Sequence, residues 1–385
     1  MIENTCMAAN SGANGDGGLT ATIDRIFVCC PAGAVTGGPE LLHQLVDALR
    51  KLGHDAFISY YPFDKPALCP QAYRHYDTAQ APVEDAANSL VIVPELGVYL
   101  LRKLRRAQGA IWWLSVDNYA GATGSSLMRD WFNLTRRFAS GKWQPRAALK
   151  GYRHFVQSHY AALFLAEAGI ASSHLSDYLG AAHIVDKSHN PLQRRDLIAY
   201  NPRKGMAVTR ALIAGNPQFQ FQPIENMSAG QVSALLATAR IYIDFGNHPG
   251  KDRMPREAAM AGCCIITGRR GSAKFDEDIA IDASYKLDER AAGFRSAFTA
   301  LVGDIFSDFS RHQRRFRIYR DVIRQEPARF QLETRALFGN RLAAPAALPD
   351  DLPCDETSSS PSPVEALKGL VPAWDRRQPN KQMFR

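Results

Sequence analysis

Two polar loops in the second half of the chain contain residues that could hold an anionic ligand. One lies at residues 201–205, NPRKG, and the other at residues 246–253, GNHPGKDR. Each loop follows a short apolar run and precedes a helical stretch, so backbone amides, glycines and cations gather near the start of a helix. This arrangement is typical of a site for a nucleotide diphosphate. The candidate ligands are Arg203, Lys204, Gly205, Asn247, His248, Gly250, Lys251 and Arg253.

The second loop leads into a short helix. Pro255 near its first turn and Gly262 at its end predict a helix over residues 255–262. Glu257 lies close to the start of this helix, where the helix dipole stabilises a carboxylate. The dipole alone is therefore a sufficient reason for an acidic residue at this position.

The elements that must position these loops alternate between strands and helices. Ser228 and Gln231 fit a capping box before one of the helices. Helical periodicity is found at 39–52, 160–169, 206–214 and 232–238, and helices dominate from 290 to about 337. Strands are predicted at 25–30, 56–60, 90–93, 110–115, 155–158, 197–200, 241–245 and 263–267.

This alternation predicts an α/β fold with two Rossmann-like domains that face a cleft, followed by a C-terminal helical segment. We expect the first domain at residues 25–180 and the second, with its closing helices, at residues 181–335. Residues 1–24 are predicted to be a disordered leader. Residues 340–385, rich in Pro, Ser, Ala and Asp, are predicted to be a disordered tail.

Residues 25–335 resemble a GT-B glycosyltransferase, a two-domain enzyme class that transfers sugars from nucleotide donors. The sequence RKG at 203–205 matches the basic loop, ending in Lys-Gly, after the first strand of the nucleotide-binding domain. The sequence EAAMAG at 257–262 is close to the family's Glu-Ala-Met-Ala-x-Gly ending. Gly37 and Gly38 resemble the glycine loop that faces the cleft from the other domain.

The resemblance implies roles for the two domains. The first would bind the acceptor, and the second would bind the nucleotide-sugar, with Glu257 accepting hydrogen bonds from the ribose hydroxyls of the donor. The nucleotide-sugar is a substrate, so no cofactor is expected. No motif with the spacing of metal ligands accompanies the loops, so no metal site is expected either.

Sugar transfer also makes chemical demands that can be stated without the family. A departing nucleoside diphosphate gains negative charge, which Arg203, Lys204, Lys251 or Arg253 could stabilise. An inverting enzyme needs a general base in the first domain, for which Asp117 is the leading candidate, followed by Glu95 and His159. A retaining enzyme can let the donor phosphate take the proton, so the stereochemistry stays open.

Composition and charge exclude several other classes of protein. Hydrophobic residues make up 46% of the chain and charged residues 22%, as in a globular protein. There is no apolar stretch of about 18 residues and no secretory signal, so we expect a cytoplasmic protein. Seven cysteines without a CxxC motif are predicted to be buried free thiols.

Basic residues cluster at 102–106 and at 311–320, within a net charge of +8. Solvated helix faces explain such clusters, and peripheral docking on the inner face of an anionic membrane is the alternative. Nucleic acid is not expected as a partner, because no recognised nucleic-acid-binding module accompanies the charge.

The sequence therefore predicts a glycosyltransferase of hexosyltransferase type that acts on a glycan or lipid-linked acceptor in bacterial surface polysaccharide assembly. Two other functions stay open. One is a catalytically idle GT-B-like protein that binds a sugar or a nucleotide, because Pro249 stands where the family has a glutamate. The other is a sugar-nucleotide 2-epimerase, which would need several acids and histidines along the cleft.

Overall fold

The computed structural model describes residues 23–119, 127–184 and 194–341. The predicted leader, the predicted tail, Cys6 and Cys354 therefore lie outside the described residues, apart from positions 23–24 and 340–341 at the edges.

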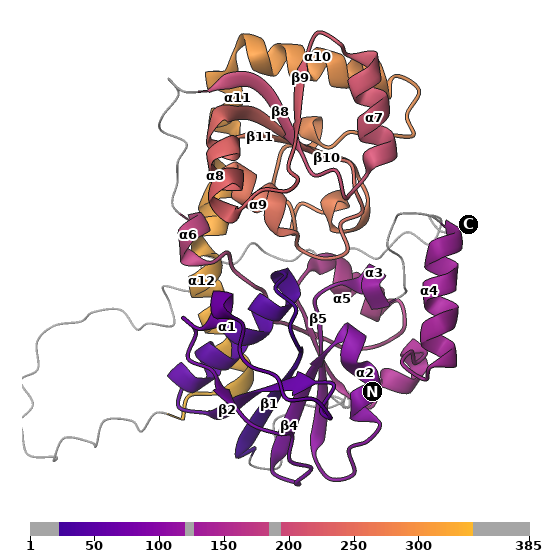
Figure 1. The fold of residues 1–385 in the computed structure, drawn as a ribbon, viewed down its shortest axis with the longest axis vertical. Helices are drawn as coiled ribbons and strands as arrows, with labels where there is room; N and C mark the ends of the chain where they lie inside the picture. The colour runs from indigo at the N-terminus through magenta and orange to yellow at the C-terminus, as the bar shows by residue number, and fades with distance from the viewer. Residues whose placement is uncertain (1–22, 120–126, 185–193, 342–385) are drawn as a thin grey trace, which may run out of the picture. The chain divides into compact units, whose positions relative to one another are not determined.

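Seven parallel strands form the first sheet, in the order β3-β2-β1-β4-β5-β6-β7 (Figure 1). The strands are β1 (Arg25–Pro31), β2 (Asp55–Tyr61), β3 (Ala79–Gln80), β4 (Ser89–Pro94), β5 (Gln108–Trp113), β6 (Arg153–Val156) and β7 (Ser173–His174). Val28 faces one buried cluster and Phe27 and Cys29 face another, because successive side chains point to opposite sides of a sheet. Burial on both faces explains why these strands read as continuous apolar runs.

Helices follow the strands of the first sheet. They are α1 (Gly37–Lys51), α2 (Val98–Leu101), α3 (Val116–Tyr119), α4 (Leu127–Ala139), α5 (His159–Ala166) and α6 (Ala181–Ile184), with 3-10 turns η1 (Gln71–Tyr73), η2 (Glu95–Gly97) and η3 (Arg146–Leu149). Leu41, Leu45 and Leu49 of α1 are buried in the same cluster as Val28. Their spacing gives α1 one continuous apolar stripe against the sheet.

Four parallel strands form the second sheet, in the order β11-β10-β8-β9. They are β8 (Arg195–Tyr200), β9 (Gln220–Pro223), β10 (Ala239–Asp244) and β11 (Cys264–Thr267). The surrounding helices and 3-10 turns are α7 (Met206–Gly215), α8 (Ala229–Thr238), α9 (Arg253–Met260), η5 (Gly271–Lys274), η6 (Ala283–Tyr285), α10 (Phe294–Ser307) and α11 (Phe309–Arg315).

The last helix, α12 (Arg317–Phe338), contributes to both cores. Tyr319 and Ile323 are buried with the second sheet, whereas Phe330 and Phe338 are buried with the first. Pro327 lies within the continuous helix, between these two groups of residues. The closing helical segment thus links the two halves through packing.

The predicted α/β fold class is confirmed, and every predicted strand is present. Ser228 and Gln231 form both hydrogen bonds of the capping box at the start of α8. The sequence did not predict β3, β7 or β9, nor the helices α2, α3, α4 and α6. Strand β9 is only half-buried, with the sequence QFQP, and so carries no apolar run. Of the cysteines, Cys29, Cys30, Cys263 and Cys264 are buried free thiols and Cys69 is a half-buried one.

Among the described helices, none has both the length and the apolar character that crossing a membrane requires.

Candidate functional site

A cavity of about 690 Å³ lies at the carboxyl ends of strands from both sheets. In the first sheet it borders the loops after the adjacent strands β1 and β4, and in the second the loops after β8 and β10. Each pair marks the point where the strand order reverses, which is where open parallel sheets bind ligands. The lining residues include Thr36, Gly37, Gly38, Tyr61, Glu95 and Gln157 from the first half and Asn201, Lys204, Asp244, Gly250, Lys251, Asp252 and Arg253 from the second.

The starts of two helices border this cavity. Gly37 and Gly38 form the first turn of α1, and Arg253 begins α9. Neither helix has a side-chain cap at its N-terminus. Free backbone N–H groups and the positive ends of two helix dipoles therefore face the same space, which favours an anion.

Lys204 supplies a cation to the cavity wall. Its ammonium donates to Asp252 Oδ2 at 2.7 Å, and 32% of its side chain is exposed, so a ligand can reach it. Burial opposes the charge, but the carboxylates of Asp252 and Asp244 outweigh burial and raise the pKa of Lys204. This residue stays fully charged at neutral pH.

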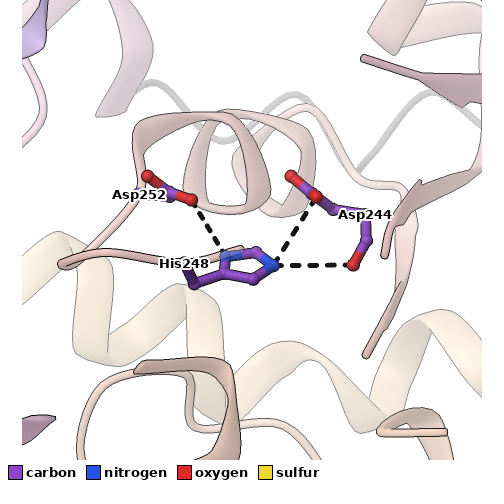
Figure 2. Close-up of side chains that lie close together, drawn as sticks. All are labelled: Asp244, His248 and Asp252. Atoms are coloured by element: carbon purple, nitrogen blue, oxygen red, sulfur yellow. Dashed lines mark hydrogen bonds and ion pairs between the residues drawn. The ribbon is translucent and has the colours of Figure 1, made fainter. Parts of the chain in front are cut away.

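Behind Lys204, His248 lies between two carboxylates (Figure 2). Its Nδ1 is 3.0 Å from Asp252 Oδ2, and its Nε2 is 3.6 Å from Asp244 Oδ1. Burial of the ring disfavours protonation, but the two aspartates together raise the pKa of His248. Burial would also raise the pKa of Asp252, yet His248 and Lys204 bring it down to about 2.

These three side chains have the ligand types and the proximity of a metal site. Lys204 pairs with Asp252, and the raised pKa of His248 favours a second positive charge beside Asp244 and Asp252. Protein groups thus already pair with the carboxylates of this cluster. The expectation that the protein has no metal site stays a prediction.

Arg253 joins the two halves of the chain. Its guanidinium pairs with Glu40 of α1 and, at 2.8 Å, with Glu257 of α9. Burial disfavours its charge, but Glu257 and Glu40 prevail and raise the pKa of Arg253. An added Cβ at Gly37 would lie 3.3 Å from Arg253, so Gly37 lets α1 approach this side chain.

Glu257 itself does not line the cavity. Oε1 accepts from Arg253, and Oε2 lies 3.7 Å from Nδ1 of His183. Its role toward the donor ribose stays a prediction.

Lys251 belongs to a buried cluster of four charges. Its ammonium is 2.7 Å from Glu326 and 3.9 Å from Asp177. Arg256 donates to the same two carboxylates, with Nη1 at 2.9 Å from Glu326 and Nη2 at 2.5 Å from Asp177. Although Lys251 borders the cavity, its charge is matched within this cluster, which joins α9 and α12 to the segment after β7.

Two glycines on these loops allow close backbone approaches. A Cβ at Gly250 would lie 2.1 Å from the carbonyl oxygen of Leu114, where the loop after β10 packs against the end of β5. Pro249 accepts a 2.8 Å hydrogen bond from the backbone of Val116 at the same place. Gly205 has φ +59°, and a Cβ there would lie 2.4 Å from the backbone of Phe245.

Asp117 and Asn247 meet across the two halves. The amide of Asn247 donates to one carboxylate oxygen of Asp117, and the hydroxyl of Tyr160 donates to the other at 2.9 Å. Burial raises the pKa of Asp117, although both hydrogen bonds act against this shift. Neither Asp117 nor Asn247 lines the cavity, so their roles in catalysis and donor binding stay predictions.

Arg203 lies apart from the other predicted donor ligands. Its side chain is exposed, does not line the cavity and forms no hydrogen bond or ion pair within the described part of the chain. Adjacent positions in the loop therefore differ, because Lys204 points into the cavity and Arg203 does not.

Glu95, ranked behind Asp117 from the sequence, is the one of these two carboxylates that lines the cavity. It lies in η2 after β4, is 3% exposed and lines the cavity. Oε2 accepts a hydrogen bond from the backbone of Leu114 at 3.1 Å, and burial raises the pKa of Glu95 to about 7. The signal was its position directly after a buried strand, next to Pro94.

No family model and no curated protein sequence matches the chain. A Rickettsia africae glycosyltransferase matches in structure, with a TM-score of 0.51 and 14% identity, over 81% of this chain and 96% of that one. Sucrose-phosphate synthase from Thermosynechococcus elongatus matches with a TM-score of 0.52 and 11% identity, over 82% and 95% of the two chains. Anabaena HepE, solved with UDP-glucose, matches with a TM-score of 0.52 and 11% identity, over 81% and 99%. The chain therefore has the GT-B glycosyltransferase fold.

Proposed function

We propose that this protein is a glycosyltransferase that moves a sugar from a nucleoside diphosphate donor to an acceptor hydroxyl. The observation that carries the proposal is the cavity at the reversal points of both sheets, where two uncapped helix starts meet the ammonium of Lys204. These groups stabilise the negative charge that develops on a departing diphosphate. A volume of about 690 Å³ lies within the range of small-molecule sites.

The donor would bind against the second sheet and the acceptor against the first. The complexes of HepE with UDP-glucose and of Arabidopsis thaliana starch synthase IV with ADP and acarbose support a nucleotide-sugar donor. We extend the proposal to hexosyl transfer onto a glycan or lipid-linked acceptor in bacterial surface polysaccharide assembly. The nucleotide-sugar is then a substrate, and neither a cofactor nor nucleic acid takes part.

Nucleotide binding and sugar transfer are to be measured separately. Thermal unfolding with UDP, GDP, TDP, CMP and their sugar conjugates should reveal one class that raises Tm, since a ligand at 100 times its Kd stabilises by about 2.7 kcal/mol. Mass spectrometry should then detect a glycosylated acceptor when the matching sugar nucleotide and an acceptor mixture are supplied. The absence of a Tm shift with every nucleotide would contradict the proposal.

A second candidate, an idle binding protein, is favoured by one observation. The carboxylates of Asp252, Glu40 and Glu257 already neutralise Lys204 and Arg253. A clear Tm shift without transfer or donor hydrolysis would support this candidate. The 2-epimerase is less well supported, because no histidine is among the described residues that line the cavity.

We propose Glu95 as the general base of an inverting reaction. Of the carboxyl groups that line the cavity, it is the one with a pKa of about 7, so it is poised to accept a proton near neutral pH. In the wild-type enzyme kcat/KM should rise with pH up to about 7, because the base must be ionised. Glu95→Gln should lower kcat by about 10²- to 10⁴-fold with little change in donor Kd.

Asp117→Asn is the matched comparison for this prediction. Its carboxylate is already held by Tyr160 and Asn247, so we expect the pH dependence of kcat/KM to be unchanged in this variant. If Asp117→Asn removes the pH dependence and Glu95→Gln keeps it, the base is Asp117. If neither variant slows transfer, the reaction uses no protein base in the first domain.

A further inference from the structure

Helix α4 turns an aromatic side toward solvent. Phe132 and Phe138 are 61% and 67% exposed. At 3.6 residues per turn, Arg137 lies on the other side of the helix. Its Nη1 donates to the backbone carbonyl oxygens of Asn118 at 2.5 Å and Tyr119 at 2.9 Å. Arg137 therefore ties the helix to its domain, while Phe132 and Phe138 stay mostly exposed, although the Phe138 ring also lies 6.0 Å from the Trp143 ring.

Cations border the two phenylalanines. Arg136 is exposed one turn after Phe132, and Lys142 is exposed just beyond the end of the helix. The ammonium of Lys142 lies 5.7 Å from the centre of the Tyr99 ring, which places the end of α4 beside α2 (Figure 1). The basic run at 102–106 follows α2 directly, and its four cations are exposed.

The charge of this region is mostly positive, although Asp85 accepts hydrogen bonds from the backbone of Arg105 and Arg106. Residues 127–153 contain seven Arg and Lys and a single acidic residue, Asp130. The α4 surface, defined here as Phe132, Phe138, Arg136, Lys142 and the run 102–106, thus combines exposed aromatic rings with a border of cations.

We propose that the α4 surface docks on an anionic lipid bilayer. Aromatic rings on one side of a helix enter the boundary between headgroups and acyl chains, and neighbouring cations are attracted by anionic headgroups. A second copy of the chain is a poorer partner, because it would bring the same cations face to face. The proposal does not depend on sugar transfer.

Co-sedimentation with lipid vesicles tests the proposal on the full chain. The wild-type protein should sediment with vesicles of phosphatidylcholine and phosphatidylglycerol and much less with phosphatidylcholine alone. Phe132→Ser with Phe138→Ser should weaken partitioning at least about tenfold, since two aromatic side chains no longer leave water. Arg136→Glu with Lys142→Glu should weaken it by roughly fivefold or more per position.

Matched variants keep the test specific to this surface. Ile318→Ser with Leu332→Ser removes two similarly exposed apolar side chains, 68% and 66% exposed, from α12. Arg314→Glu with Arg317→Glu changes two exposed cations of the run 311–320. Both control pairs should bind vesicles like the wild type.

Three outcomes would overturn the proposal. The first is a wild-type protein that stays in the supernatant with anionic vesicles. The second is vesicle binding that the α4 variants keep or the α12 controls lose. The third is a dimer, detected by sedimentation velocity, that Phe132→Ser with Phe138→Ser dissociates, which would assign the surface to a second copy of the chain.

Discussion

Replacing Lys204 by methionine is expected to weaken the binding of nucleoside diphosphates by about 10- to 100-fold. Hydrogen bonds to charged groups contribute about 1.5–3 kcal/mol each, and this ammonium belongs to the cation of its loop that borders the cavity. The methionine keeps the apolar stem of the side chain, so the change isolates the charge. Isothermal titration calorimetry with the nucleotide found by the Tm screen measures the loss.

Arg203→Ala is the control for Lys204→Met. The two positions are adjacent, and both carry a cation, but only Lys204 borders the cavity. We expect Arg203→Ala to change Kd less than about twofold, because this side chain is exposed and pairs with none of the residues that the structure describes. Equal losses in the two variants would mean that the diphosphate binds outside the cavity.

The second large effect is expected from Arg256→Met, and it concerns stability. Arg256 is fully buried between Asp177 and Glu326, and removing one member of a buried ion-pair cluster typically costs about 3–5 kcal/mol. Lys251 would then face two carboxylates alone. Unfolding in urea, followed by circular dichroism, should show the loss as a lower midpoint.

Arg317→Met supplies the matched control, because the same chemical change is made on an exposed position of α12. The free energy of unfolding should change there by no more than about 0.5 kcal/mol. If Arg256→Met lowers the free energy of unfolding by less than about 1 kcal/mol, the cluster does not hold α9, α12 and the segment after β7 together. Arg256→Lys keeps the charge but not the planar guanidinium. Its loss in the free energy of unfolding should lie between the losses of Arg256→Met and Arg317→Met.

The GT-B fold could be predicted from the sequence because its signals are local. Apolar runs marked the buried parallel strands, and the capping box at Ser228 and Gln231 marked the start of α8. The loops that line the cavity could be found for the same reason, since each follows a strand and precedes a helix. Strand β9 was missed because a half-buried edge strand carries no apolar run. Helix α4 was missed although its apolar residues Leu127, Trp131, Leu134 and Phe138 recur at helical spacing.

What each charged side chain does was decided by the tertiary structure. Lys204 pairs with a carboxylate 48 positions away, Arg256 with one 70 positions away and Arg253 with one 213 positions away. Such partners share no pattern in the sequence. The same holds for Gly250, whose lack of a side chain matters because the end of β5 lies against it.

The sequence by itself determined where the loops with cations and glycines lie between strands and helices. It could do so because the signals for strands and helices extend over only a few neighbouring residues. The tertiary structure decided that Lys204 faces the cavity while Arg203 does not, and that Lys251 is matched by Glu326. It also placed the buried carboxyl of Glu95 in the wall of that cavity. The physical reason is that burial and ion pairing depend on distances in space between residues far apart along the chain.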